Sequence, residues 1–225
     1  MYGRVATGKV VDLSFIKWLD FCCIYFNLLK GSYIAILLLL FQSVYGQSRE
    51  ELFAEELVSA ALRLCEQEVV YDPAYYALDY PNGDVPADRG VCSDVIIRAY
   101  RYLDIDLQEE VHVDMQSHFE LYPAIWGLSR TDANIDHRRV PNLMKYFERH
   151  GMEKPITNKS ADYLAGDIVC WNLGGALTHI GILVDLRSTD GLRPMVVHNI
   201  GRGQVLEDCL FDYRIIGHYI YQGKN

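Results

Sequence analysis

The chain has 225 residues, of which 50% are hydrophobic and 12% aromatic, and its formal net charge is −9 at pH 7. This length allows one sizeable core, and this composition is that of a globular protein rather than a disordered one. An acidic surface repels phosphate backbones, so we expect no nucleic-acid partner.

Residues 1–46 resemble a targeting segment more than part of a fold. The run over 33–41 is apolar, follows Lys30, and leads through short residues to Gly46. A positive flank, a short apolar stretch and a small exit residue are typical of a secretory signal, and we expect cleavage after Gly46. A second apolar stretch over 13–29 leaves open an uncleaved membrane segment.

Export would place a single domain over residues 47–225 in the periplasm or cell envelope, outside the reducing cytosol. Its cysteines are Cys65, Cys92, Cys170 and Cys209. Their spacing matches neither a disulfide framework nor a zinc ribbon, although one bridge among the three other than Cys92 stays open. We expect a monomer without metal or cofactor, which meets the membrane only through its N-terminal segment.

Helical periodicity dominates the first half of this domain, because apolar side chains recur there at three- and four-residue spacing. The expected helices cover residues 50–70, 92–103, 106–119 and 141–150. The last begins at Pro141, a favoured first-turn residue, and stops at Gly151. An irregular segment covers 120–140.

Strand-like runs dominate the second half, each short and bounded by glycine or turn residues. The expected strands are Asp167–Trp171, His179–Asp185, Met195–Asn199 and Ile215–Tyr221. Helices followed by strands are the order of an α+β domain.

Cys92 stands where a loop passes into the second helix, in the sequence GVCSD over 90–94. Unpaired N–H groups at a helix N-terminus lower the pKa of a thiol, and the thiolate is the nucleophile. This position indicates a catalytic cysteine. The alternative is a small residue that packs at a helix start. Cys65 and Cys170 lack the placement, since one is expected within a helix and the other within a strand.

Two histidines complete a candidate catalytic set. His179 opens an apolar strand and His198 lies in the next strand region, so antiparallel pairing would bring them side by side. A base must lie within hydrogen-bond reach of the thiol, and a further polar residue can hold the base in the right tautomer. Each histidine alone is more often structural. A zinc site built from Cys92, His179 and His198 is the competing interpretation.

Four segments carry a further pattern: the helix start at Cys92, Gly166-Asp167-Ile168-Val169, His179-Ile180-Gly181-Ile182 and Val197-His198. They resemble the NlpC-type branch of papain-like cell-wall peptidases. The resemblance implies a papain-like fold, with N-terminal helices packed on a small antiparallel sheet. It also implies that Cys92 attacks an amide carbonyl, that His179 is the base, and that His198 orients His179.

The same resemblance implies a tyrosine upstream of the cysteine that helps to bind the oxyanion. Tyr80, twelve residues before Cys92, fits by spacing. Tyr71, Tyr75 and Tyr76 are alternatives in the same loop.

Longer motifs are similar to the YijF-like family of bacterial envelope proteins, a domain of unknown function (DUF1287). They are the stretches 80–86, 90–101 and 134–143, and the similarity runs from about residue 55 to 222. The chain departs from the NlpC-type pattern in two ways. Ser93-Asp94 follows the cysteine in place of Ser-Gly, and a large insert separates the helix from the strands, which puts the substrate in question more than the nucleophile.

The insert over 104–140 offers candidate substrate-binding residues: Trp126, Asp136, Arg138 and Arg139. The forked donors of an arginine can bind a carboxylate, and peptidoglycan stem peptides carry carboxylates. The alternative is that Asp136 and the arginines pair internally and fix the loop to the body.

Two hypotheses for function follow. The first is a cysteine hydrolase that cleaves an amide bond in a peptidoglycan peptide through a thioester, with the oxyanion held by the backbone N–H of Cys92 and a side-chain donor. The second is a non-catalytic envelope module that binds wall peptides or a partner protein.

Overall fold

The computed structural model describes residues 49–224. The chain divides into two compact units, Met1–Arg49 and Glu50–Asn225, and the description below concerns the second. The expected signal or membrane segment over 1–46 lies outside the described residues. Within residues 49–224, no helix is long and apolar enough to cross a membrane.

The helices form where apolar periodicity predicts them. A first helix covers the described residues 49–64 and is followed by α2 (Cys92–Arg101), α3 (Leu107–Ser117) and α4 (Val140–His150). The first ends earlier than expected, because the chain extends into strand β1 (Val70–Tyr71), which pairs with β2 (Arg89–Gly90). Short 3-10 turns are η1 (Phe119–Leu121), η2 (Asp136–Arg138) and η3 (Ser160–Asp162).

The strands form an antiparallel sheet in the order β3-β8-β4-β5-β6-β7. The four expected strands are β4 (Ile168–Gly174), β5 (Leu177–Arg187), β6 (Pro194–His198) and β8 (Arg214–Ile220). Two short edge strands were not expected: β3 (Met152–Glu153) and β7 (Val205–Glu207). The α+β class is therefore confirmed.

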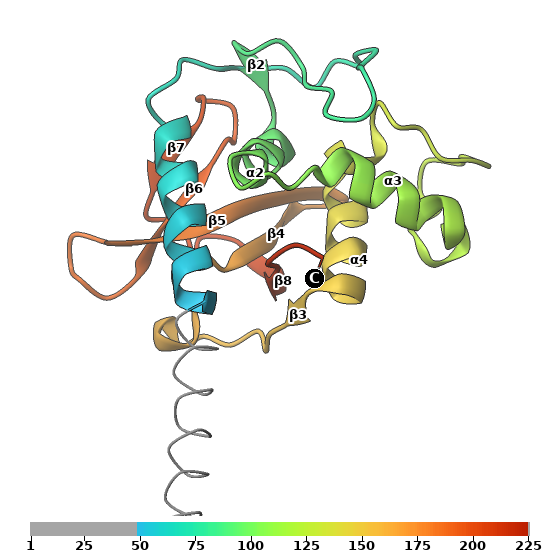
Figure 1. The fold of residues 1–225 in the computed structure, drawn as a ribbon. Coiled ribbons are helices and arrows are strands. Elements are labelled where there is room, and N and C mark those ends of the chain that lie inside the picture. The colour runs from blue at the N-terminus through green and yellow to red at the C-terminus, as the bar shows by residue number, and fades with distance from the viewer. Residues whose placement is uncertain (1–48, 225) are drawn as a thin grey trace, which may run out of the picture. The chain divides into compact units, whose positions relative to one another are not determined.

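The sheet has a different core on each face, as strand alternation requires. Along β4, Ile168 and Cys170 pack with the residues of the helices, whereas Val169 and Trp171 pack in a second cluster with Leu210. Figure 1 shows α2 and α4 lying over the sheet, and α2 packs against β5. This contact brings the N-terminus of α2 to the start of β5.

Candidate active site

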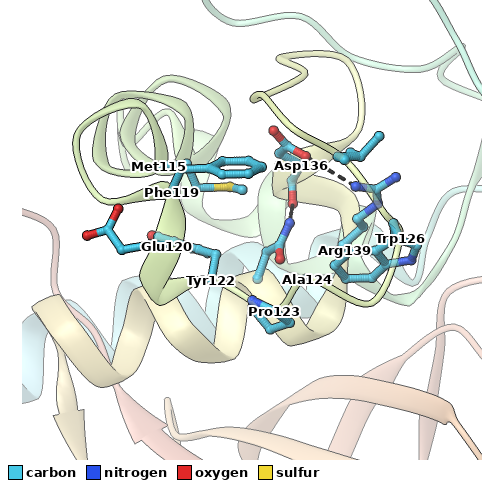
Figure 2. Close-up of a pocket in the computed structure, with 11 residues that line it drawn as sticks. Met115, Phe119, Glu120, Tyr122, Pro123, Ala124, Trp126, Asp136 and Arg139 are labelled. Carbon is cyan, nitrogen blue, oxygen red and sulfur yellow. Dashed lines mark hydrogen bonds and ion pairs between the residues drawn. The ribbon is translucent and has the colours of Figure 1, made fainter.

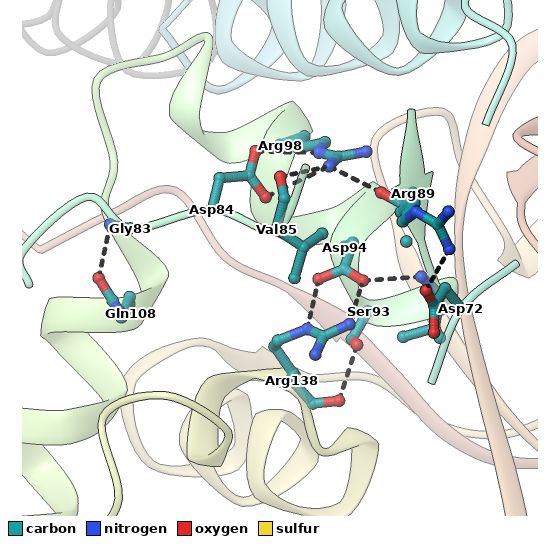
Figure 3. Close-up of polar contacts among 12 residues, drawn as sticks. Asp72, Gly83, Asp84, Val85, Arg89, Ser93, Asp94, Arg98, Gln108 and Arg138 are labelled. Carbon is teal, nitrogen blue, oxygen red and sulfur yellow. Dashed lines mark hydrogen bonds and ion pairs between the residues drawn. The ribbon is translucent and has the colours of Figure 1, made fainter. Parts of the chain in front are cut away.

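The first turn of α2 is fixed by a buried ion pair. The Asp94 carboxylate accepts from Nε and Nη2 of Arg138 at 2.8 and 2.9 Å, and from the backbone N–H of Val91 at 2.7 Å. The Ser93 hydroxyl donates to the Arg138 carbonyl at 2.7 Å (Figure 3). These bonds hold the turn that carries Cys92 against η2.

The residues before Cys92 are held from two other sides. The backbone N–H of Asp72 donates to the carbonyl of Gly90 at 3.1 Å, and Nδ2 of Asn199 donates to the same carbonyl at 3.3 Å. Tyr71 lies opposite Gly90 in the β1–β2 pair. The end of β6 therefore meets the chain two residues before the cysteine.

The sulfur of Cys92 lies at an open edge of β5. Leu183 donates its N–H to the carbonyl of Asp167 at 2.9 Å, so odd-numbered residues of β5 turn toward β4 and even-numbered ones toward β6. Because β6 ends at His198, the N–H of Ile180 meets no strand partner there. It interacts with the Cys92 thiol instead.

Burial outweighs the helix terminus in setting the acidity of this thiol. Cys92 is only 5% exposed, and burial raises its pKa to about 12, although the N–H groups of Ile180, Ser93 and Cys92 itself act in the opposite direction. Burial, and then the charge of His198, lower the pKa of His179 to about 3. The resting site therefore holds a neutral thiol and a neutral imidazole, not the acidic thiol expected from helix position alone.

The two histidines meet directly, as antiparallel pairing predicted. Nε2 of His179 lies 2.8 Å from Nδ1 of His198, and Nε2 of His198 lies 2.9 Å from Oε2 of Glu207. The His179 ring also packs on Trp171, with centroids 5.8 Å apart. Both histidines are buried.

The carboxylate of Glu207 sets the direction of this hydrogen-bond chain. An ionised carboxylate only accepts, so Nε2 of His198 carries the proton and Nδ1 accepts from Nε2–H of His179. Nδ1 of His179 is then the unprotonated nitrogen, and it makes no hydrogen bond within residues 49–224. The hydrogen-bond chain from Glu207 through His198 thus ends at an acceptor nitrogen of His179, which is what a general base requires.

The glycine after Ile180 allows the two rings to meet. A Cβ on Gly181 would lie 2.7 Å from Cγ1 of Val196 and 3.2 Å from Cβ of His198. Any side chain here would displace β6 and with it the His198 ring.

The thiol and the first imidazole are not joined by a hydrogen bond. In the described part of the chain, Cys92 makes no hydrogen bond to His179 or His198. The His179 ring is turned toward His198 and Trp171, whereas the sulfur borders the core on the helix side, beside Cys170. The structure therefore brings the two histidines together. It places the sulfur of Cys92 beside the backbone of Ile180, the residue that follows His179.

Tyr71 is the tyrosine that the structure places near the sulfur. Burial raises the pKa of Tyr71, and the next largest cause is the charge of Cys92. The Tyr71 hydroxyl makes no hydrogen bond to any of the residues described. Tyr80, the tyrosine favoured by spacing, is 45% exposed and packs edge-on against His112, with ring centroids 5.0 Å apart.

The other two tyrosines are occupied elsewhere. The hydroxyl of Tyr75 donates to Asp132 at 3.1 Å, and that of Tyr76 donates to Asp72 at 2.7 Å. Of the four candidates, Tyr71 therefore has both the position and the free donor.

Three of the four candidate substrate-binding residues form internal ion pairs. Arg138 is buried in its pair with Asp94, and Asp136 is buried and pairs with Arg139 at 3.3 Å. For these three residues the geometry agrees with the alternative in which Asp136 and the arginines pair internally and fix the loop to the body.

Arg139 and Trp126 remain at the surface of a cavity of about 100 Å³. The Arg139 guanidinium lies over the Trp126 ring, 4.2 Å from its centroid (Figure 2). Asp136 also lines this cavity, and Phe119 and Pro123 give it apolar walls.

Comparison with known proteins identifies the family. A family described as a domain of unknown function, DUF1287, matches residues 58–221. The chain belongs to this family. It is also 55% identical over 151 residues, 67% of this chain and 73% of the relative, to the uncharacterized protein YijF of Escherichia coli strain K12. No solved structure matches it.

Sequence reasoning on this DUF1287 chain missed Glu207. It lies on β7, a strand of three residues, Val205–Glu207, which is too short for alternation to be read. The available signal in the sequence was Glu207 itself, an acidic residue that follows two apolar residues shortly after His198. The four cysteines of the described chain are free thiols in this structure.

Acid is expected to destabilise this chain through its buried neutral histidines. The pKa of His137 is lowered to about 3 by burial, and that of His179 to about 3 as well, from 6.5. As pH falls from 6.5 toward 3, the unfolded chain takes up protons that the folded chain excludes, so the free energy of unfolding decreases. Urea unfolding across this range should show a shallower decrease for His137→Gln. Parallel curves for the variant and the wild type would contradict the burial of a neutral ring.

Proposed function

We propose that this chain is a cysteine hydrolase of papain-like, NlpC-type fold that cleaves an amide bond with Cys92 as nucleophile. The observation that supports the proposal is the hydrogen-bond chain from Glu207 through His198 to His179. It ends in an acceptor nitrogen, and the residue after His179 directs its N–H at the sulfur.

In this mechanism the sulfur attacks the amide carbonyl while its proton passes to Nδ1 of His179. The pKa values of the resting pair, about 12 for Cys92 and about 3 for His179, mean that proton transfer accompanies attack and does not precede it. The His179 ring turns toward the sulfur when substrate binds, since catalytic hydrogen bonds often tighten only in the complex.

The remaining steps follow from the charges that develop. The oxyanion of the tetrahedral intermediate accepts hydrogen bonds from the backbone N–H of Cys92 and from the hydroxyl of Tyr71. His179 returns its proton to the leaving amine, which gives a thioester on Cys92. Water, activated by the same imidazole, then hydrolyses the thioester and releases the free thiol.

The proposed substrate is a peptidoglycan peptide, and the proposed location is the periplasm or cell envelope. The N-terminal segment is of the secretory type, and a wall peptide carries the carboxylates that Arg139 could bind beside Trp126. The acidic charge of the chain makes a basic or zwitterionic peptide a better partner than a polyanion.

The direct test is digestion of purified sacculi by the full-length chain, followed by mass analysis of the soluble fragments. The wild type should release peptides with a newly formed carboxyl end, and Cys92→Ala should release none. Cys65→Ala, which changes a thiol in the turn after the first helix, is the control and should act as the wild type does. Identical fragments from wild type and Cys92→Ala would remove the hydrolase proposal.

A second candidate is a non-catalytic module that binds wall peptides or a partner protein. The burial of Cys92 and the missing bond from its sulfur to His179 favour this reading. Cosedimentation of Cys92→Ala with sacculi, in a preparation that releases no fragments even with the wild type, would support it.

Tyr71→Phe is expected to reduce the rate of amide cleavage by roughly 100-fold, because it removes one oxyanion donor while keeping the ring. Tyr80→Phe should leave the rate within about threefold of the wild type, since its hydroxyl does not approach the sulfur. Initial rates of fragment release measure both. A larger loss in Tyr80→Phe than in Tyr71→Phe would return the oxyanion role to the position favoured by spacing.

A further inference from the structure

Three side chains at the edge between β6 and β7 converge on one point. Nε2 of His198 lies 2.9 Å from Oε2 of Glu207 and 3.6 Å from Sγ of Cys209. Single ligand atoms of all three residues lie within 4.8 Å of one another. Nitrogen, oxygen and sulfur donors of this kind are the ligands of zinc.

The spacing of these three ligand atoms fits tetrahedral coordination of an ion. Zinc–ligand bonds of about 2.0 to 2.3 Å separate neighbouring ligand atoms by roughly 3.4 to 3.6 Å. The nitrogen-to-sulfur separation of 3.6 Å already has this value, and the nitrogen-to-oxygen separation of 2.9 Å needs a small opening. Thiolate and imidazole together select zinc over magnesium or calcium.

The surroundings also suit a cation. Glu207 uses Oε1 for its ion pair with Arg202 at 2.7 Å, so Oε2 is left for the ion. The hydrogen bond between Nδ1 of His198 and His179 fixes the ring as an outer partner of a ligand does. Asp208 and Asp212 line the adjoining surface cavity, which gives water access to a fourth position.

We propose that His198, Glu207 and Cys209 bind one zinc ion, with water as the fourth ligand, and that the bound ion opposes catalysis. On binding, the Cys209 thiol releases its proton to solvent and the ion takes the lone pair of Nε2 of His198. The proton of His198 then resides on Nδ1.

This change reverses the hydrogen-bond chain. With a proton on Nδ1, His198 donates to Nε2 of His179, which leaves the His179 proton on Nδ1, the nitrogen that the proposed mechanism uses as the base. That nitrogen no longer accepts a proton from Cys92. The metal site stands on its own geometry, whereas this inhibitory effect rests on the proposed function.

The site is tested by competition between the full-length chain and a chromophoric zinc chelator, with any affinity tag removed. One ion should bind, and Cys209→Ser or Glu207→Gln should weaken binding by at least roughly tenfold. Cys92→Ala should bind as the wild type does. No saturable binding, or binding unchanged in Cys209→Ser, would overturn the site. If Cys92→Ala no longer binds zinc, the ion belongs to Cys92, His179 and His198, and that result would also overturn the proposed site.

The effect on the thiol is tested by the rate of iodoacetamide labelling of Cys92, followed by peptide mass analysis. Zinc should lower the labelling rate of Cys92 in the wild type and leave that rate unchanged in Cys209→Ser. Equal slowing in both would overturn the inhibitory effect. Because zinc binding is measured without substrate, a chain that binds zinc at this site but releases no fragment from sacculi would refute the proposed function and leave the metal site standing.

Discussion

His179→Ala is expected to reduce the rate of amide cleavage by about 10⁴-fold, the loss that follows when a nucleophile is deprived of its base. The sulfur would keep its place beside the N–H of Ile180, but with a pKa near 12 it has no acceptor for its proton. His198→Ala should cost less, about 10²-fold, because it removes only the group that sets the tautomer of His179.

The measurement is the initial rate of fragment release from sacculi, with thermal unfolding as a check on the fold. His118→Ala, which changes a half-exposed histidine at the end of α3, is the matched control and should keep the wild-type rate. A His179→Ala rate within a few-fold of the wild type would show that the proton leaves by another route. The assignment of the base would then be lost even if Cys92 remains the nucleophile.

Arg138→Met is expected to lower the free energy of unfolding by about 3 to 5 kcal/mol, because it leaves the buried Asp94 carboxylate without its partner. Both side chains are almost completely buried, at 2% and 3% exposure, and two hydrogen bonds join them. Asp94 also accepts from the backbone at Val91, so its displacement would loosen the turn that carries Cys92.

A surface pair provides the control for that variant. Arg89 pairs with Asp72 at 2.7 Å but is 45% exposed, so Arg89→Met should lower the free energy of unfolding far less than Arg138→Met does. The double variant Asp94→Asn with Arg138→Met should recover part of the loss, since it removes the unpaired charge. Urea unfolding measures all of them. Equal losses for Arg138→Met and Arg89→Met would mean that burial does not set the strength of the pair.

The elements whose side chains repeat with a clear period could be predicted from sequence. The apolar spacing of 92–103 and the runs at 179–185 and 195–199 give α2, β5 and β6 nearly as they stand. Adjacency of His179 and His198 then follows, because consecutive short strands pair antiparallel. The three-residue strand β7 has no readable period, so Glu207 could not be connected to them.

The sequence by itself determined the α+β order, the family, and the presence of one cysteine and two histidines at element ends. Only the tertiary structure decided how deeply those residues are buried and which groups they contact. Burial, which depends on every segment packed around a side chain, raises the pKa of Cys92 above what its helix position implies and commits Arg138 to Asp94. It also places Tyr71 and not Tyr80 beside the sulfur, because strand pairing with Gly90 and not distance along the chain sets that contact.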